Sequence, residues 1–524
     1  MGEWWRDAVV YEIYPRSFAD SDGDGVGDLA GLTSRLAYVA KLGIQAVWIT
    51  PFQRSPQADH GYDVSDYCNV DPLFGDLATF DEMLRCAHGH QLRVIIDLVP
   101  NHCSSAHPLF QAALAAGPGS RDRARFHFAP GLGPDGAMPP NNWASVFGGP
   151  AWTRISEPDG SPGQWYLHLY APEQPDWNWR DPQTAPFFDE VLRFWFDRGV
   201  DGLRVDVAHG LFKAEGLPDL AATATPAPMR LRANPLACDR EEVHGVYRRW
   251  RALADAYAPP RALIGEVNVS PARAVRYTRP DELHQAFAFA FLAAPWDSRA
   301  WQSIIRELLD TRGAAPVTWV VENHDVVRAA TRYGDGICGI ARARAALLAV
   351  LGLPGAAYLY QGQELGLPEV DVPPQVRQDP AWSRCGVSRD GCRVPLPWRR
   401  DANGTHGFSA EPARSPWLPV PASWGVYSVE AQEADPDSTL HLCRAALTLR
   451  CRLHAQGALS ADDAVGVDIN PHGALVVRRG EAMVLVLAMG NMPVHLPPGR
   501  LLLASGPLTH DGRLPPDTTA WLRC

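Results

Sequence analysis

Short runs rich in β-branched and aromatic residues alternate with amphipathic stretches from residue 8 to about residue 420 of this chain. Strands that alternate with helices form parallel sheets, and eight such units close into a barrel ringed by helices. The runs are continuously apolar, as strands covered on both faces should be. The predicted strands are residues 8–18, 46–52, 93–102, 202–210, 262–267, 285–292, 318–325 and 356–364. The sequence therefore predicts an α/β fold, a (β/α)8 TIM barrel.

Two segments depart from this alternation. Residues 104–180 follow the third predicted strand, are rich in Gly, Pro, Asn and Trp, and are too long for a simple βα loop. We interpret them as an inserted subdomain B. After a predicted helix at 438–454, short apolar runs separated by turns predict a C-terminal antiparallel β-sandwich. The expected domains are a barrel of residues 1–103 and 181–430, subdomain B at 104–180 and a C-terminal domain at 431–524.

Three of the predicted strands carry a carboxylate at or near their carboxyl end. These are Asp206 in GLRVDVAHG, Glu266 in ALIGEVNV and Asp325 in TWVVENHDVVR. An unpaired buried carboxylate is costly, so packing alone does not explain the charges. Because the carboxyl ends of barrel strands meet at one rim, the three groups should converge there. Such a set can supply acid, base and nucleophile for cleavage of a glycosidic bond.

The net charge and composition exclude some classes of binding partner and indicate the cellular compartment. A net charge of −11 argues against nucleic acid or an anionic membrane as partner. The N-terminus lacks a basic segment followed by an apolar one, and no run reaches the ~18 apolar residues of a membrane span. The ten cysteines show no CxxC pair, which favours free thiols in a reducing compartment. We therefore expect a cytoplasmic protein, monomeric or homodimeric.

Several motifs in a fixed order resemble glycoside hydrolase family 13, the α-amylase family, and within it the α-glucosidase and oligo-1,6-glucosidase branch. The central ones are DLVPNH (97–102), DGLRVDV (201–207), GEV (265–267) and ENHD (322–325). They are joined by WWRDAVVYEIYPRSFADSDGDGVGD (4–28), QPDWNW (174–179) and RDGCRVPLPW (389–398). The resemblance extends from residue 4 to about residue 400, with a family-like C-terminal domain after it.

The resemblance implies separate roles for the three carboxylates. Asp206 matches the nucleophile and Glu266 the general acid/base of a retaining mechanism, which needs the two carboxyl groups about 5–5.5 Å apart. Asp325 matches the carboxylate that binds sugar hydroxyls and stabilises an oxocarbenium-like state. Arg204 lies two residues before Asp206, so both side chains should face the same way on one strand. We expect Arg204 to keep Asp206 ionised.

The resemblance also implies a pocket for one glucose unit. Asp59 and Tyr62 of DHGYD should bind and stack on the sugar, and His102 and His324 should hydrogen-bond its hydroxyls. Arg389 is the expected ion-pair partner of Asp59, with Arg393 as the alternative. The remaining candidates are the pocket walls Phe147 and Tyr170, for which simple packing is almost as good an explanation, and Val207, a position that influences linkage preference in relatives.

An acidic loop near the N-terminus forms a second constellation. Oxygen ligands at alternate positions, with glycines between them, suit Ca²⁺ or Mg²⁺. An EF-hand does not fit, because Gly31 stands at the twelfth position, where that motif has Glu. The resemblance implies instead a structural cation, remote from the chemistry. The expected ligands are Asp20, Asp22, Asp24, Asp28 and the Val26 carbonyl.

The sequence thus predicts a retaining α-glucosidase that acts on terminal non-reducing α-glucosyl residues of maltose, short malto-oligosaccharides or related α-glucosides. Transglucosylation uses the same residues and stays open. A trehalose-synthase-like isomerase or a sucrose-acting relative is an alternative on the same site. A binding protein on this fold is a further alternative, which retention of all three carboxylates disfavours.

Overall fold

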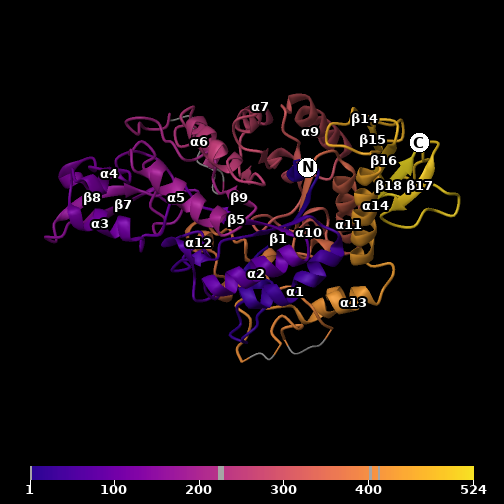
Figure 1. The fold of residues 1–524 in the computed structure, drawn as a ribbon, viewed down its shortest axis with the longest axis horizontal. Coiled ribbons are helices and arrows are strands. Elements are labelled where there is room, and N and C mark those ends of the chain that lie inside the picture. The colour runs from indigo at the N-terminus through magenta and orange to yellow at the C-terminus, as the bar shows by residue number, and fades with distance from the viewer. Residues whose placement is uncertain (1–2, 222–228, 230, 401–403, 411–412) are drawn as a thin grey trace.

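The computed structural model describes residues 3–221, 229, 231–400, 404–410 and 413–524 (Figure 1). Its centre is an eight-stranded parallel sheet in the order β11-β10-β9-β5-β2-β1-β13-β12. A parallel bridge between Phe287 and Thr318 joins the two outer strands, so the sheet closes into a barrel. The strands are β1 (Val9–Ile13), β2 (Ala46–Ile49), β5 (Arg93–Leu98), β9 (Gly202–Val205), β10 (Ala262–Gly265), β11 (Gln285–Ala286), β12 (Thr318–Val320) and β13 (Ala356–Tyr360). The predicted TIM barrel is confirmed.

Helices cover the outside of the barrel. Their apolar faces join the outward side chains of the strands in one large core, while a smaller cluster that includes Trp48, Ile95, Ile264 and Tyr358 fills the barrel interior. The covering helices are α1 (Leu29–Leu42), α2 (Leu77–Gly89), α5 (Thr184–Asp197), α6 (Val243–Asp255), α9 (Ser298–Thr311) and α11 (Gly336–Gly352). Shorter elements between them are β3 (Gln53–Arg54), β4 (Asp66–Val70), α7 (Pro271–Ala274), α10 (Ala329–Arg332) and α12 (Pro380–Cys385).

The strands are shorter than the apolar runs that predict them. The run at 202–210 is extended only to Val205, and the run at 318–325 only to Val320. The run at 285–292 is partly wrong, because β11 ends at Ala286 and Phe289–Leu292 form the short helix α8. In each case the apolar residues continue past the strand into the loops at the carboxyl rim, where most of them are still buried.

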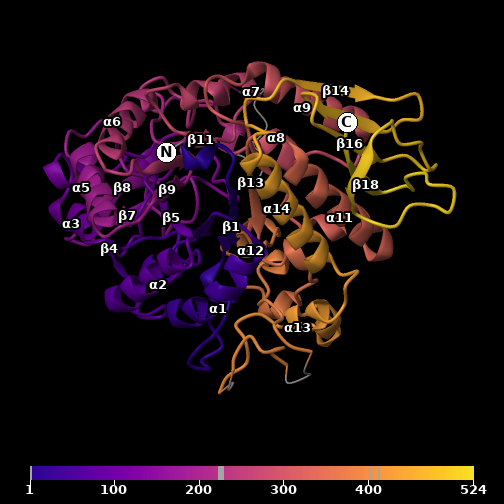
Figure 2. The same cartoon turned by 45° about the vertical axis from the view of Figure 1, so that its right-hand side comes forward.

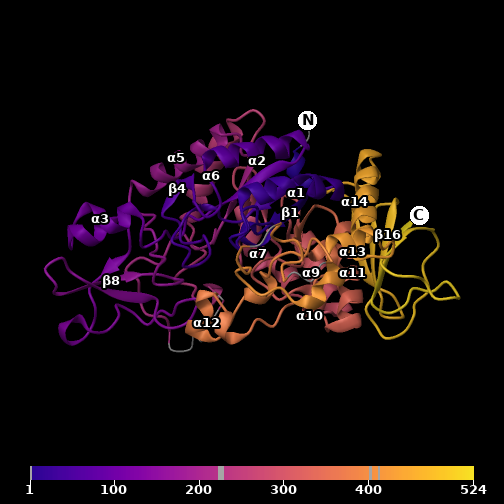
Figure 3. The same ribbon diagram turned by 90° about the horizontal axis from the view of Figure 1, so that it is seen from below.

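The segment after β5 projects from one side of the barrel, at the left of Figures 1 and 3. It contains α3 (Pro108–Ala116) and α4 (Arg121–Ala124). A three-stranded antiparallel sheet in the order β6-β8-β7 follows, built from β6 (Phe128–Ala129), β7 (Trp152–Ser156) and β8 (Pro162–Leu167). A bridge between His102 and Asp176 ties the end of this segment to its beginning. The segment therefore leaves the barrel and returns at the same corner.

The C-terminal region packs at the opposite side of the barrel (Figure 2). After α13 (Val429–Glu433) and α14 (Thr439–Ala455), five antiparallel strands form one sheet in the order β14-β15-β16-β18-β17. They are β14 (Val465–Ile469), β15 (Leu475–Arg479), β16 (Met483–Ala488), β17 (Arg500–Ala504) and β18 (Thr518–Arg523). The predicted antiparallel β domain is confirmed. Its second layer is α11, against which Trp521 and Leu485 pack, rather than a second sheet.

Among the described residues, no helix has both the length and the apolar character that a bilayer span requires.

Candidate active site

The carboxylates of Asp206 and Glu266 meet at the carboxyl rim of the barrel, joined by one guanidinium. Arg204 Nη1 lies 2.6 Å from Asp206 Oδ1, and its Nη2 lies 2.8 Å from Glu266 Oε2. Nη1 also donates to Asp97 Oδ1 at 2.7 Å. Arg204 is 2% exposed. Because β9 and β10 are neighbours in the sheet, the residues that follow them are held side by side around this buried cation.

The electrostatics of this pair differ from our expectation that Asp206 is ionised. Burial raises the pKa of Asp206 well above its usual range, and although Arg204 acts in the opposite direction, the neighbouring Glu266 and Asp97 carboxyls raise it further. The charge of Arg204 therefore does not offset burial and the neighbouring carboxyl groups. The raised pKa favours the protonated form of Asp206, whereas nucleophilic attack requires the ionised form.

Val207 holds Glu266 through its backbone. Its φ of 44° is a left-handed conformation that β-branched residues rarely adopt, and the resulting turn points its amide at Glu266 Oε2, 3.0 Å away. Its side chain is 3% exposed and packs in a cluster with Phe147 and Leu231. Strain of this kind persists only where surrounding structure enforces it and is frequent at functional sites.

Asp325 lies beside two guanidinium groups and a histidine ring. Arg393 Nη2 is 2.9 Å and Arg389 Nη1 is 3.1 Å from its Oδ1, and His324 Nε2 is 3.5 Å from its Oδ2. Burial acts to raise its pKa, but these three neighbours outweigh burial and hold the pKa of Asp325 below its usual range. Asp325 is therefore ionised, as a group that stabilises a developing positive charge must be.

Arg389 also closes one end of the pocket. Its Nη2 lies 2.9 Å from Asp59 Oδ1, so the structure pairs Asp59 with Arg389 rather than with Arg393. Asp379 binds the same guanidinium through both oxygens, at 2.8 and 2.9 Å. Sequence reasoning missed Asp379. Its position before a short helix is typical of a helix cap, and the side chain does accept a hydrogen bond from Ala381 N. Its contact with Arg389 depends on how the loop that joins the two residues folds.

The two pocket histidines are held by different partners. Tyr62 Oη lies 2.8 Å from His324 Nε2, and the two rings are stacked. The other nitrogen, Nδ1, lies 2.5 Å from Glu12 Oε1. Glu12, on β1, was also missed, because one acidic residue in an apolar strand carries no spacing signal. Burial lowers the pKa of His324 to about 3, so its ring is neutral.

His102 is fixed by amide side chains. Gln174 Nε2 lies 3.1 Å from its Nε2 and donates to Asp59 Oδ2 at 3.1 Å, so one amide links two pocket residues. Asn101 Nδ2 lies 3.1 Å from the other ring nitrogen, and Asn101 Oδ1 accepts from Lys213 at 2.7 Å. Gln174 and Lys213 were not predicted as site residues, although Gln174 begins the QPDWNW motif.

The two candidate pocket walls lie beside these residues. The rings of Phe147 and Tyr170 are 5.4 Å apart, and the Tyr170 ring is 5.1 Å from His102. Phe147 lies under the Arg389 guanidinium at 5.0 Å. Trp177 of the QPDWNW motif is fully buried and stacked on Phe126 at 4.5 Å. It joins the inserted segment to the barrel.

The acidic loop brings three of its carboxylates together. Oxygen atoms of Asp20, Asp22 and Asp28 all lie within 4.8 Å of one another. Asp24 stands outside this group. Its pKa is raised by burial and by the neighbouring Asp22, Asp20 and Asp28 carboxylates. An all-oxygen donor set with mutual repulsion fits a hard divalent cation such as Ca²⁺ or Mg²⁺, far from the Asp206–Glu266 pair in the chain.

Comparison with known proteins agrees with this architecture. The model of the α-amylase catalytic domain matches residues 12–457. A probable α-glucosidase of Rhizobium meliloti is 40% identical over 470 residues, covering 86% of this chain and 82% of the relative. An oligo-1,6-glucosidase of Parageobacillus thermoglucosidasius is 32% identical, covering 85% and 83%.

Solved structures with the same fold include the α-glucosyl transfer enzyme XgtA, with a TM-score of 0.90 and 35% identity over the whole of both chains. The trehalulose synthase MutB of Pseudomonas mesoacidophila has a TM-score of 0.88 and 28% identity, again over both whole chains. A barrel with these relatives defines a glycoside hydrolase. The chain belongs to the α-amylase family, glycoside hydrolase family 13, and resembles its α-glucosidases and oligo-1,6-glucosidases.

Proposed function

We propose that this enzyme is a retaining α-glucosidase that removes terminal non-reducing α-glucosyl residues from maltose, short malto-oligosaccharides or related α-glucosides. The observation that carries the proposal is the closed end of the pocket. Asp59, Arg389 and Asp379 form one buried ion-paired group, as expected at the end of a pocket that admits a single terminal sugar ring. The Asp206–Glu266 pair then lies where the bond to that sugar would be cut.

In the first step, the Asp206 carboxylate attacks the anomeric carbon, the glycosidic C–O bond breaks, and Glu266 gives its proton to the departing oxygen. The product is a β-glucosyl ester of Asp206. In the second step, Glu266 takes a proton from water while the water oxygen attacks the anomeric carbon and the ester bond breaks. Asp325 stabilises the positive charge in both steps, and the Val207 amide keeps Glu266 in place.

Azide separates the two carboxylate roles. With a p-nitrophenyl α-glucoside, Glu266→Ala should lose about 10³-fold or more in turnover and regain rate with azide, which attacks the intermediate and yields the α-glucosyl azide. Asp206→Gly should form no intermediate, and azide should instead displace the leaving group directly to yield the β-glucosyl azide.

The anomer formed is read by NMR. Exchanged products, or near-normal activity of either variant without azide, would contradict the assignment. The control is Asp371→Asn, which removes a carboxylate whose side chain is 97% exposed and should therefore keep wild-type turnover.

Transfer of glucose to a sugar, or isomerisation of a disaccharide, is the second candidate. It is favoured by the solved relatives, a glucosyl transfer enzyme and a trehalulose synthase. Any acceptor that Glu266 can deprotonate completes the same second step. Product analysis by NMR, with maltose or sucrose at low and high concentration, distinguishes the candidates. Free glucose at every concentration supports hydrolysis, and new disaccharides at high concentration support transfer.

We further infer that the acidic loop holds a structural Ca²⁺ or Mg²⁺ and that the enzyme acts in the cytoplasm. The clustering of Asp20, Asp22 and Asp28 supports the cation. All ten cysteines are free, which supports a reducing compartment. A monomer or homodimer remains the prediction for the assembly, and sedimentation tests it.

A further inference from the structure

Four polar side chains gather around Trp417, beyond the Asp59–Arg389 end of the pocket. The Arg16 guanidinium lies 4.9 Å from the Trp417 ring, the His60 ring 5.1 Å and the Tyr14 ring 6.3 Å. The Arg393 guanidinium lies 5.4 Å from the Tyr14 ring. We call Tyr14, Arg16, His60 and Arg393 the Arg16 cluster. They come from three separate loops of the barrel rim.

Every member of the Arg16 cluster is at least nine-tenths buried, with exposed fractions of 1%, 8%, 6% and 0%. Each nevertheless has a buried polar atom without a hydrogen-bond partner among the described residues. These atoms are Tyr14 Oη, Arg16 Nε, both ring nitrogens of His60, and Arg393 Nη1. Buried polar groups are almost always hydrogen-bonded, so several unpartnered ones around one ring indicate a common ligand.

The charged groups around these atoms indicate whether the ligand is an anion or a cation. Among the described residues, no carboxylate oxygen lies within 4.0 Å of Arg16, and its one side-chain hydrogen bond is to Gln57 Oε1 at 3.3 Å. The Asp71 and Asp24 carboxylates act on Arg16 only from farther away. Burial, together with the fields of Arg16, Arg393 and Arg389, holds the pKa of His60 well below its usual range, so its ring is neutral. An arginine stays charged when buried, and a buried charge without a counter-charge is costly.

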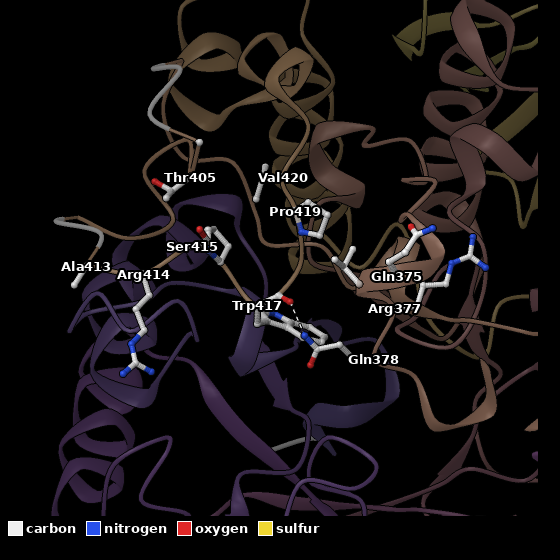
Figure 4. Close-up of a pocket in the computed structure, with 13 residues that line it drawn as sticks. Gln375, Arg377, Gln378, Thr405, Ala413, Arg414, Ser415, Trp417, Pro419 and Val420 are labelled. Atoms are coloured by element: carbon white, nitrogen blue, oxygen red, sulfur yellow. Dashed lines mark hydrogen bonds between the residues drawn. The ribbon is translucent and has the colours of Figure 1, made fainter. Parts of the chain in front are cut away.

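Trp417 forms part of the wall of a hollow of about 880 Å³ (Figure 4). The described residues that line the hollow are 375–378, 404–405, 413–417 and 419–420. Among them Arg377 and Arg414 are charged and none is acidic. In Figure 4 the Trp417 backbone accepts a hydrogen bond from Gln378, which fixes the wall. The described lining of this hollow next to Trp417 is therefore positively charged.

We propose that the Arg16 cluster binds a small monovalent anion of the size of chloride. Tyr14 Oη–H, Arg16 Nε–H, Arg393 Nη1–H and one ring N–H of the neutral His60 are the available donors. The anion supplies the counter-charge in direct contact that Arg16 lacks. The site does not depend on the proposed glucosidase activity, because the sugar pocket ends at Asp59 and Arg389, and it differs in sign from the acidic loop.

Thermal unfolding at constant ionic strength tests the proposal. The enzyme is dialysed into potassium gluconate, whose anion is too large for the cluster, and then titrated with chloride or bromide. At about one hundred times the dissociation constant, the unfolding midpoint should rise by a few degrees and saturate. A crystal soaked in sodium bromide should show an anomalous peak within hydrogen-bonding distance of Arg16 Nε and Tyr14 Oη.

Two variants make the test specific. Arg16→Gln should lose the saturable chloride response, whereas Arg35→Gln should keep it, since Arg35 also stacks on a tryptophan, Trp398, but outside the cluster. If Arg16→Gln does not fold, His60→Asn replaces it, because asparagine tolerates the positive φ of 51° at this position. His60→Asn should weaken the chloride response of the unfolding midpoint at least severalfold. No midpoint difference between gluconate and chloride in the wild type, or no bromide peak at the cluster, overturns the proposal.

Discussion

Two arginines organise the charges of the active site. Arg204 contacts Asp97, Asp206 and Glu266, and Arg389 contacts Asp59, Asp325 and Asp379. Each buried guanidinium is paired with carboxylates to which we also assign roles in substrate binding or catalysis. Removing one partner from such a group costs about 3–5 kcal/mol, because it leaves a buried charge uncompensated. Stability and catalysis are therefore linked at these residues.

Asp59 should make stability depend on pH. Burial raises its pKa to about 6 despite Arg389, against roughly 3.9 in an unfolded chain. Between these values the folded protein holds a proton that the unfolded chain has released. This contribution to stability is complete below about pH 4 and is lost as the pH rises through 6. Asp59→Asn removes it, so urea unfolding should show the variant gaining about 1–3 kcal/mol relative to wild type between pH 4 and pH 7.

The exposed Asp371→Asn variant should show no such change relative to wild type over the same range. A constant difference between Asp59→Asn and wild type would contradict the raised pKa.

Motifs were sufficient to name the residues that we predict to contact a sugar, and insufficient for the residues that hold them in place. Asp206, Glu266, Asp325 and Asp59 lie where the motifs suggest. Glu12, Asp379, Gln174 and Lys213 act through contacts with residues far away in the chain, such as Glu12 with His324. A lone acidic or basic residue has the same appearance in sequence whether it is exposed or paired across the fold.

At the level of elements, the loops after the strands carry the chemistry. Val207 turns directly after β9 and Phe289 begins a helix soon after β11. Hydrophobicity predicted that these segments are buried, but it could not separate a buried strand from a buried loop. The lengths of the strands were overestimated for that reason.

The acidic loop is the element whose stability should depend on a metal ion. If a cation binds Asp20, Asp22 and Asp28, then chelation with EDTA should lower the unfolding midpoint by several degrees, because a ligand that binds only the folded state stabilises it. The initial rate at 25 °C should stay within about twofold, since none of the described contacts of Asp20, Asp22 and Asp28 involves Asp206, Glu266 or Asp325.

Asp22→Asn should lower the midpoint without EDTA and abolish the further effect of EDTA. Asp511→Asn, in an exposed turn, serves as the matched control. A fall in rate with no fall in midpoint would contradict a structural role.

At the level of the whole molecule, one glycine sets how closely the C-terminal sheet approaches the barrel. A Cβ at Gly352, the last residue of α11, would lie 2.6 Å from Leu485 Cδ1 and 2.7 Å from Trp521 Nε1. Gly352→Ala should therefore destabilise the protein by about 1–3 kcal/mol through overpacking, as measured by thermal or denaturant unfolding. KM and kcat at 25 °C should be unchanged, because the sheet lies opposite the inserted segment (Figure 1).

Gly245→Ala is the matched control, because Gly245 is also helical but has no atom within 4 Å of its Cβ position. It should stabilise the protein by about 0.5–1 kcal/mol. Equal effects at the two positions would mean that the close approach at Gly352 does not limit packing.

The sequence by itself determined the order of strands and helices, the closed barrel and the carboxylates at its rim, since hydrophobic periodicity and motif spacing are local properties. Only the tertiary structure decided which charges meet. Arg389 lies 330 positions from Asp59 in the chain, and the energy of an ion pair depends on separation in space and on burial. The Asp59–Arg389 ion pair and the Arg16 cluster both join loops that are distant in the chain, and the contacts between such loops are not encoded in local sequence.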